Sequence, residues 1–170
     1  MEEIRDRCLD KVYEEVWIFR ESFEESPWYL AAKAGSADAQ FVLGYVMLGE
    51  LGHKEDKAEA VRYLRSAADQ GHPHALYELA GLYKDGRGVF RSKRRAWALL
   101  HQAVVAGSLQ AYYALAIGLY SSGDMPDEPE IVLWLLEKTA AGGHAESQLA
   151  LGKVLTEGKV CNPDQAEAVK

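Results

Sequence analysis

The chain has 170 residues, of which 48% are hydrophobic and 26% charged, and its formal net charge is −7 at pH 7. This composition is ordinary for a folded domain and argues against intrinsic disorder. The acidic balance argues against general binding to nucleic acid or to anionic membrane, because phosphate binding depends on clustered Lys and Arg. No apolar run approaches the roughly 18 residues that a membrane span needs.

The N-terminus lacks the apolar segment of a secretory signal. The two cysteines, Cys8 and Cys161, lie far apart and show no metal-ligand spacing. Such cysteine usage fits a reducing compartment better than a disulfide framework, so we expect a cytoplasmic protein.

A period of 36 residues organises almost the whole chain. It is shared by four glycines and four leucines, namely Gly35, Gly71, Gly107 and Gly143, and Leu43, Leu79, Leu115 and Leu151. A period of this size indicates stacked supersecondary units, and such a stack leaves long open faces that bind other molecules.

In chain order, residues 1–26 carry an apolar stripe between many Glu and Arg residues. We predict that they form an amphipathic capping helix, because a terminal repeat needs a polar outer face. Ser26 and Pro27 are typical of a helix start, and the helix that follows is expected over Trp28–Ala34. The register then predicts a half repeat at 27–36, full repeats at 37–72, 73–108 and 109–144, and a partial repeat at 145–170.

The unit at 73–108 shows the pattern most clearly. Its apolar residues have helical spacing over Ala75–Lys84, Gly86 and Gly88 break that helix, and a second helical run from Lys93 to Ala106 ends at Gly107. Each repeat is therefore predicted to be an antiparallel pair of helices. By register, the other helices are expected at Ala37–Leu48, Lys57–Gln70, Gln110–Tyr120, Glu128–Ala141 and Glu146–Thr156.

Small residues recur where the two helices of a repeat should approach most closely. One column contains Gly44, Ala80, Ala116 and Gly152, and a second contains Ala60, Ala96 and Val132. A small side chain permits close backbone contact, so we expect both columns to lie between the paired helices.

The run Ala75–Tyr83, followed by Gly86-Arg-Gly-Val89 and by Gly107, resembles one complete Sel-1-like repeat, a relative of the tetratricopeptide repeat. Residues Ala60–His72 are similar to the second helix of that family and to the turn after it. The resemblance covers about residues 27–170. It implies an all-α fold, a right-handed α/α superhelix of 36-residue helix-turn-helix repeats whose first helices line a concave face, and it implies adaptor or scaffold roles.

If the first helices line a groove, an aromatic-rich strip should cross three repeats and bind a segment of a partner protein, since Tyr combines a large contact area with a polar tip. The strip consists of Phe41, Tyr45, Leu48, Tyr77, Lys84, Tyr113, Ile117 and Tyr120. Packing between repeats explains the column of Phe41, Tyr77 and Tyr113 equally well, and both interpretations stay open for these three residues.

A basic cluster interrupts the otherwise acidic chain, and it consists of Arg87, Arg91, Lys93, Arg94 and Arg95. One interpretation is a docking site for an acidic peptide, because Arg makes bidentate contacts with carboxylates. The alternative is a solvated turn and helix start. Nucleic-acid binding has less support, because the cluster does not continue as a basic stripe.

His72 and His74 do not indicate a metal site, because His72 and His144 occupy the same repeat position and no cysteine or carboxylate set accompanies them. The sequence also lacks the motifs of nucleotide-binding loops and nucleophilic hydrolases. We therefore predict no catalytic residue, no metal and no cofactor.

The expected function is that of a non-catalytic interaction scaffold or adaptor. One alternative is a bacterial toxin-immunity or secretion-adaptor protein, whose acidic charge would complement a basic toxin. Another is a hydrolase or small-ligand protein, which would need a deep polar pocket. Homodimerisation through the C-terminal repeat is also left open.

Overall fold

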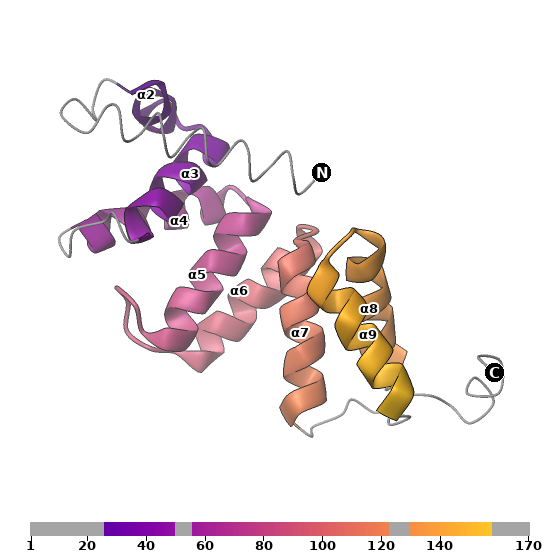
Figure 1. Ribbon diagram of the computed structural model, residues 1–170. Helices are drawn as coiled ribbons and strands as arrows, with labels where there is room; N and C mark the ends of the chain where they lie inside the picture. Colours follow the sequence, from indigo (N-terminus) through magenta and orange to yellow (C-terminus); the bar gives the residue numbers. More distant parts are fainter. Residues whose placement is uncertain (1–25, 50–55, 123–129, 158–170) are drawn as a thin grey trace. The chain divides into compact units, whose positions relative to one another are not determined.

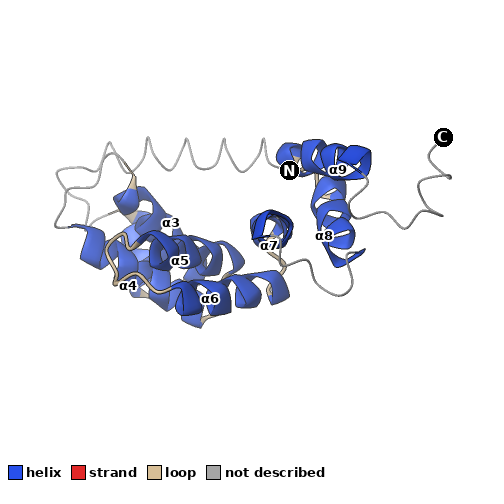
Figure 2. Ribbon diagram, turned by 90° about the horizontal axis from the view of Figure 1, so that it is seen from below, coloured by secondary structure: helices blue, strands red, loops and turns tan. Residues whose placement is uncertain are grey.

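The computed structural model describes residues 26–49, 56–122 and 130–157, and every element of secondary structure in these residues is a helix (Figures 1 and 2). The order is α2 (Pro27–Lys33), α3 (Ala37–Leu48), α4 (Asp56–Asp69), α5 (Pro73–Asp85), α6 (Lys93–Val105), α7 (Leu109–Ser122), α8 (Glu130–Ala141) and α9 (Ala145–Glu157). The predicted helix ends agree with these bounds to within two residues. The start predicted for α8 at Glu128 and the capping helix over 1–25 lie outside the described residues.

The chain divides into two compact units, Met1–Ala106 and Gly107–Lys170. In the first unit, α3 packs against α4 and α5 against α6, while α2 packs on α3 and α4 packs on α5. These contacts form the two predicted hairpins and place them next to each other in chain order. In the second unit, α8 packs against both α7 and α9.

The core of each unit is built from the periodic apolar residues. Leu43 and Leu64 are fully buried between α3 and α4, and Leu79 has only 4% of its surface exposed. In the second unit, Val132 and Leu136 are fully buried. None of the helices in the described part of the chain is long and apolar enough to cross a membrane.

The four glycines that share the period all stand at helix ends with φ between 79° and 99°, a conformation that residues with a side chain rarely adopt. The residue after each glycine lies at the start of the next helix. In three of them its side chain accepts a hydrogen bond from a backbone N–H: Ser36 from Ala39 at 3.3 Å, His72 from Ala75 at 3.1 Å and Ser108 from Ala111 at 3.3 Å. The glycine and the cap together stop one helix and start the next.

The small-residue column lies between the paired helices, as predicted. At Gly44, an added Cβ would lie 2.7 Å from Cγ of Leu64 and 2.9 Å from the carbonyl oxygen of Ala60, whereas Ala80 and Ala116 are buried at the equivalent positions. Gly152 differs, because an added Cβ would meet nothing within 4 Å. The helix expected to pack on Gly152 belongs to residues 158–170, outside the described part.

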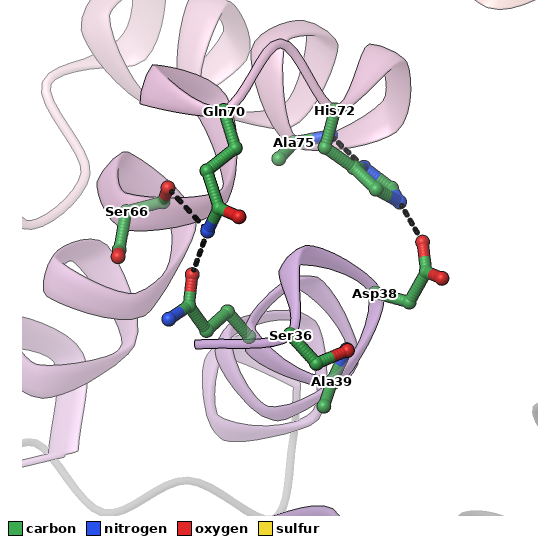
Figure 3. A network of polar contacts seen from close by, with 8 residues as sticks. Ser36, Asp38, Ala39, Ser66, Gln70, His72 and Ala75 are labelled. Atoms are coloured by element: carbon green, nitrogen blue, oxygen red, sulfur yellow. Dashed lines mark hydrogen bonds and ion pairs between the residues drawn. The ribbon is translucent and has the colours of Figure 1, made fainter. Parts of the chain in front are cut away.

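A buried glutamine ties the half repeat to the first hairpin. Gln40 on α3 donates a hydrogen bond to the carbonyl oxygen of Ala32 at 3.1 Å and accepts one from Gln70 at 2.8 Å. Gln70 also donates to the carbonyl oxygen of Ser66, as Figure 3 shows. Gln148, at the equivalent position on α9, repeats the first contact by donating to Ala140 at 3.3 Å.

Candidate protein-binding surface

Four side chains of the first unit form a continuous group of rings, which we call the aromatic cluster: Phe41 and Tyr45 on α3, His72 at the turn before α5, and His74 on α5. The Phe41 ring stacks on His72, with centroids 4.7 Å apart and planes at 22°. Tyr45 and His74 each lie 5.7 Å from the Phe41 centroid. All four residues are partly exposed, so the cluster forms part of the surface.

His72 holds the cluster at the junction of two repeats. Its Nδ1 accepts the hydrogen bond from the backbone of Ala75, and its Nε2 lies 3.2 Å from a carboxylate oxygen of Asp38 (Figure 3). Because Nδ1 acts as acceptor, the neutral ring carries its proton on Nε2 and donates it to Asp38. The imidazole thus links the start of α5 to the first turn of α3, which confirms a structural role for His72.

Burial sets the electrostatics of this surface. It lowers the pKa of His72 below its ordinary value of 6.5, and the neighbouring Asp38 carboxylate opposes that effect. Glu78, one helical turn after His74 on α5, has its pKa raised by burial, while Arg87 acts in the opposite direction. Each shift is in the direction that favours the neutral form, because burial penalises the charged form of either group.

Phe41 has a packing role as well as an exposed edge. Besides stacking on His72, it packs against the buried pair Val42 and Val46. This contact favours the packing interpretation of Phe41 that the sequence left open. Tyr45 is better placed for a ligand, because its ring is partly exposed and no hydrogen bond engages its hydroxyl within the described residues.

The remaining residues of the predicted strip are divided between the two units. In the first unit, Leu48 and Tyr77 are partly buried and Lys84 is exposed. In the second unit, Tyr113 lies 4.9 Å from the ring of His144, which repeats the pairing of Phe41 with His72, and Ile117 and Tyr120 are partly buried. A strip that runs across three repeats stays a prediction.

The basic cluster is partly used within the protein. The Nε of Arg91 donates to the carbonyl oxygen of Lys84 at 3.0 Å, and Arg87 acts electrostatically on Glu78. Arg95 donates to the hydroxyl of Tyr83 at 3.3 Å. Lys93 and Arg94 are exposed in the first turn of α6.

Arg65 was absent from the predicted basic cluster, yet it lies beside Arg95. From α4, it donates to the same Tyr83 hydroxyl at 3.0 Å. Nothing in the local sequence around Arg65 indicates this contact, because it joins residues 18 positions apart on different helices.

Metal binding gains no candidate residues from the described part of the fold. Across residues 26–49, 56–122 and 130–157, no group of three or more His, Cys, Asp or Glu side chains could hold a metal ion. His72 and His74 lie with ring centroids 5.8 Å apart, and the ring nitrogens of His72 are already engaged by Ala75 and Asp38.

Comparison with protein families explains the recurring turn and cap. The model of the Sel1 repeat matches residues 37–72, 73–107 and 145–170, which is more than half of the chain. The chain belongs to the Sel1 repeat family. The repeat at 109–144 is not among the matched ranges, although α7 and α8 pair there. Its sequence has Ser122-Gly-Asp-Met-Pro126 in place of the Gly-x-Gly-Val pattern that the middle repeat has at Gly86–Val89.

Two fungal relatives of the chain are regulators by name. The chain is 34% identical to Chitin synthase regulatory factor 1 of Schizosaccharomyces pombe over 52% of its own length and 20% of that protein. It is 33% identical to Chitin synthase regulator SKT5 of Malassezia restricta over 61% of its length and 8% of that protein. The chain thus spans a fifth or less of these relatives.

Solved structures show the same fold. The protective antigen c5321 of uropathogenic Escherichia coli, described as having an SLR fold, matches with a TM-score of 0.67 and 28% identity over 79% of this chain and 29% of that one. A Sel1 repeat protein from Oxalobacter formigenes matches with a TM-score of 0.67 and 23% identity over 83% of this chain and 57% of that one. The all-α Sel1 fold is therefore confirmed, while the right hand of the superhelix stays a prediction.

Proposed function

We propose that this Sel1 repeat chain is a non-catalytic, cytoplasmic interaction module that binds a segment of a partner protein through the aromatic cluster. The observation that carries the proposal is the Tyr45 side chain, a partly exposed ring 5.7 Å from the Phe41 ring, whose hydroxyl makes no hydrogen bond within the described residues. Such a surface offers apolar contact area together with polar tips, the combination found at the centres of protein interfaces.

The fungal relatives support a regulatory form of this role. Both are named as regulators of an enzyme, and a regulator without its own chemistry acts by binding. We therefore propose that the partner is a protein whose activity or position this chain controls. These names favour regulation over the toxin-neutralising alternative.

The test begins with affinity capture of partners from the native cell, followed by titration of the purified partner. Tyr45→Ala should weaken binding by roughly 2 kcal/mol, or about thirtyfold, if Tyr45 is a hot spot. Trp97→Ala is the matched control, because Trp97 is also a partly exposed aromatic residue but lies on a second helix, α6. Circular dichroism should show both variants folded.

Two results would contradict the proposal. If no specific protein is captured, the chain is not an interaction module. If a partner is captured but Tyr45→Ala binds it as tightly as the native chain does, the binding surface lies elsewhere on the molecule.

A further inference from the structure

Two arginines from different helices converge on one tyrosine. Arg65 on α4 and Arg95 on α6 donate to the hydroxyl of Tyr83 on α5 at 3.0 and 3.3 Å. Their guanidinium carbons lie 5.9 and 5.5 Å from the centroid of the same ring. We propose that Arg65 and Arg95 bind carboxylates of an acidic, extended segment of the partner protein, an inference that rests on the proposed function.

The two positive charges are held close together, and no described residue places a carboxylate beside them. Because both guanidinium groups bond the same oxygen, the two donor nitrogens are no more than about 6 Å apart. Neither arginine has a carboxylate partner among the described residues. Like charges at this distance repel each other, and an anion placed between them would turn that repulsion into attraction.

Arg62 is an arginine of the same unit that does have a carboxylate partner, and it serves as a comparison for Arg65. It lies on the same helix as Arg65 and also stands near a tyrosine ring, 5.9 Å from the centroid of Tyr63. In contrast to Arg65, it makes a 2.8 Å ion pair with Glu59. The arginines at Tyr83 have no such partner in the described part of the chain, which leaves most of their N–H donors available to a ligand there.

Tyr83 makes the pair a built site. Its side chain is buried, with 6% of the residue surface exposed, whereas both arginines are exposed. The ring and the hydroxyl of Tyr83 restrict the conformations of both guanidinium groups. The arginine side chains therefore lose less conformational entropy when a ligand binds.

The repeat register shows that this charge is particular to one repeat. One period before Arg95 stands Glu59, and one period before Arg91 stands Glu55. These two positions therefore carry acidic residues in one repeat and basic residues in the next. The net charge of the whole chain is −7. The reversal creates a local site for an anion while the rest of the chain repels polyanions.

The spacing fits an extended peptide. In an extended chain, side chains two residues apart lie on the same side and about 6–7 Å from each other. Acidic residues at alternate positions would therefore each meet one guanidinium group. A polyphosphate backbone is disfavoured by the acidic remainder of the protein.

The experiment uses the full chain and a synthetic peptide of alternating Glu and Ser, titrated at about physiological ionic strength. We expect the peptide to bind, and the same peptide with Gln in place of Glu to bind at least about tenfold more weakly. Arg65→Gln combined with Arg95→Gln should lower affinity for the Glu peptide at least about tenfold. The matched control is Lys93→Gln combined with Arg94→Gln, which removes the same charge from exposed positions and should lower affinity no more than about threefold.

Two further variants keep the test decisive if the double variant unfolds. Tyr83→Phe retains both charges but removes the oxygen that holds them, and Arg95→Lys retains the charge but removes the planar fork. Each should weaken binding of the Glu peptide by at least about threefold, with the melting curve reported alongside.

Three outcomes would overturn the inference: equal losses in the two double variants, equal binding of the Gln peptide, or tighter binding of single-stranded DNA with the same arginine dependence. Tyr45→Ala should leave peptide binding unchanged. If the peptide fails to bind while a Tyr45-dependent partner is captured, this inference is wrong and the proposed function stands. If the peptide binds but no partner is captured, the arginine site is supported and the proposed function is wrong.

Discussion

Gly44 on α3 packs closely against Ala60 and Leu64 on α4, and replacing it with Ala tests how tightly the first hairpin is packed. The added Cβ would lie 2.7 Å from Cγ of Leu64 and 2.9 Å from the carbonyl oxygen of Ala60. Leu64 is fully buried, and the carbonyl oxygen belongs to the helix backbone. Neither atom can move away without shifting α4, so the added methyl group must separate the two helices.

The expected magnitude is a difference between two effects. Alanine is favoured over glycine inside a helix by about 1 kcal/mol, whereas overpacking a well-filled core costs about 1–3 kcal/mol, and more where the backbone must move. Because two contacts at Gly44 fall below 3.0 Å, we expect an overpacking cost in the upper part of that range, about 2–3 kcal/mol, which exceeds the helix preference. The net loss in the free energy of unfolding should be about 1–2 kcal/mol.

Gly81→Ala is the matched control. Gly81 lies inside α5 of the same unit, and a Cβ added there would meet nothing within 4 Å. This variant should gain about 0.5–1 kcal/mol, because only the helix preference remains. Urea unfolding followed by circular dichroism would measure both variants, and a 2 kcal/mol difference corresponds to a midpoint separation of roughly 1 M. A Gly44→Ala variant as stable as Gly81→Ala would refute the close packing of α3 on α4.

Three further changes test the core, the imidazole cap and the buried amide. Leu79→Ala should lower the free energy of unfolding by about 2–5 kcal/mol, because Leu79 is buried between the helices of the middle repeat; a urea melt showing no loss would contradict that core assignment. Burial lowers the pKa of His72 in the folded chain, so the unfolded chain binds more protons in this pH range. The contribution of His72 to the free energy of unfolding is therefore complete above its ordinary pKa of 6.5 and is lost as the pH falls below that value. His72→Ser keeps a capping oxygen, as at Ser36, and its unfolding free energy should fall less between pH 7.5 and about 5.5 than that of the native chain; equal pH dependence would show that His72 does not contribute. Gln40→Ala should lower the free energy of unfolding by about 1–3 kcal/mol, since the carbonyl oxygen of Ala32 and the amide of Gln70 lose their partner. Gln40→Leu places at this position the residue type that Leu76 has in the next repeat, and it should be less destabilising. Thermal melts that rank the two variants the other way would contradict this explanation.

Much of the local structure followed from the period alone. The helix bounds, the glycine that ends each repeat and the position of Gly44 between paired helices were all predicted from residues in the same or the next repeat. Such features depend on backbone preferences and on apolar spacing, which are properties of short segments. The cap made by His72 was not predicted from the sequence, although it acts on a backbone N–H only three residues away.

The candidate sites depended on contacts between helices. The sequence placed Arg95 in a cluster of neighbours, but only the packing of α4, α5 and α6 brought Arg65 to the same Tyr83 hydroxyl. In the same way, only the docking of α5 beside α3 stacked His72 on Phe41. A repeat period determines which helices become neighbours. Which side chains meet between them depends on how each helix is rotated and on which rotamers the packed core allows, and these properties belong to the folded unit as a whole.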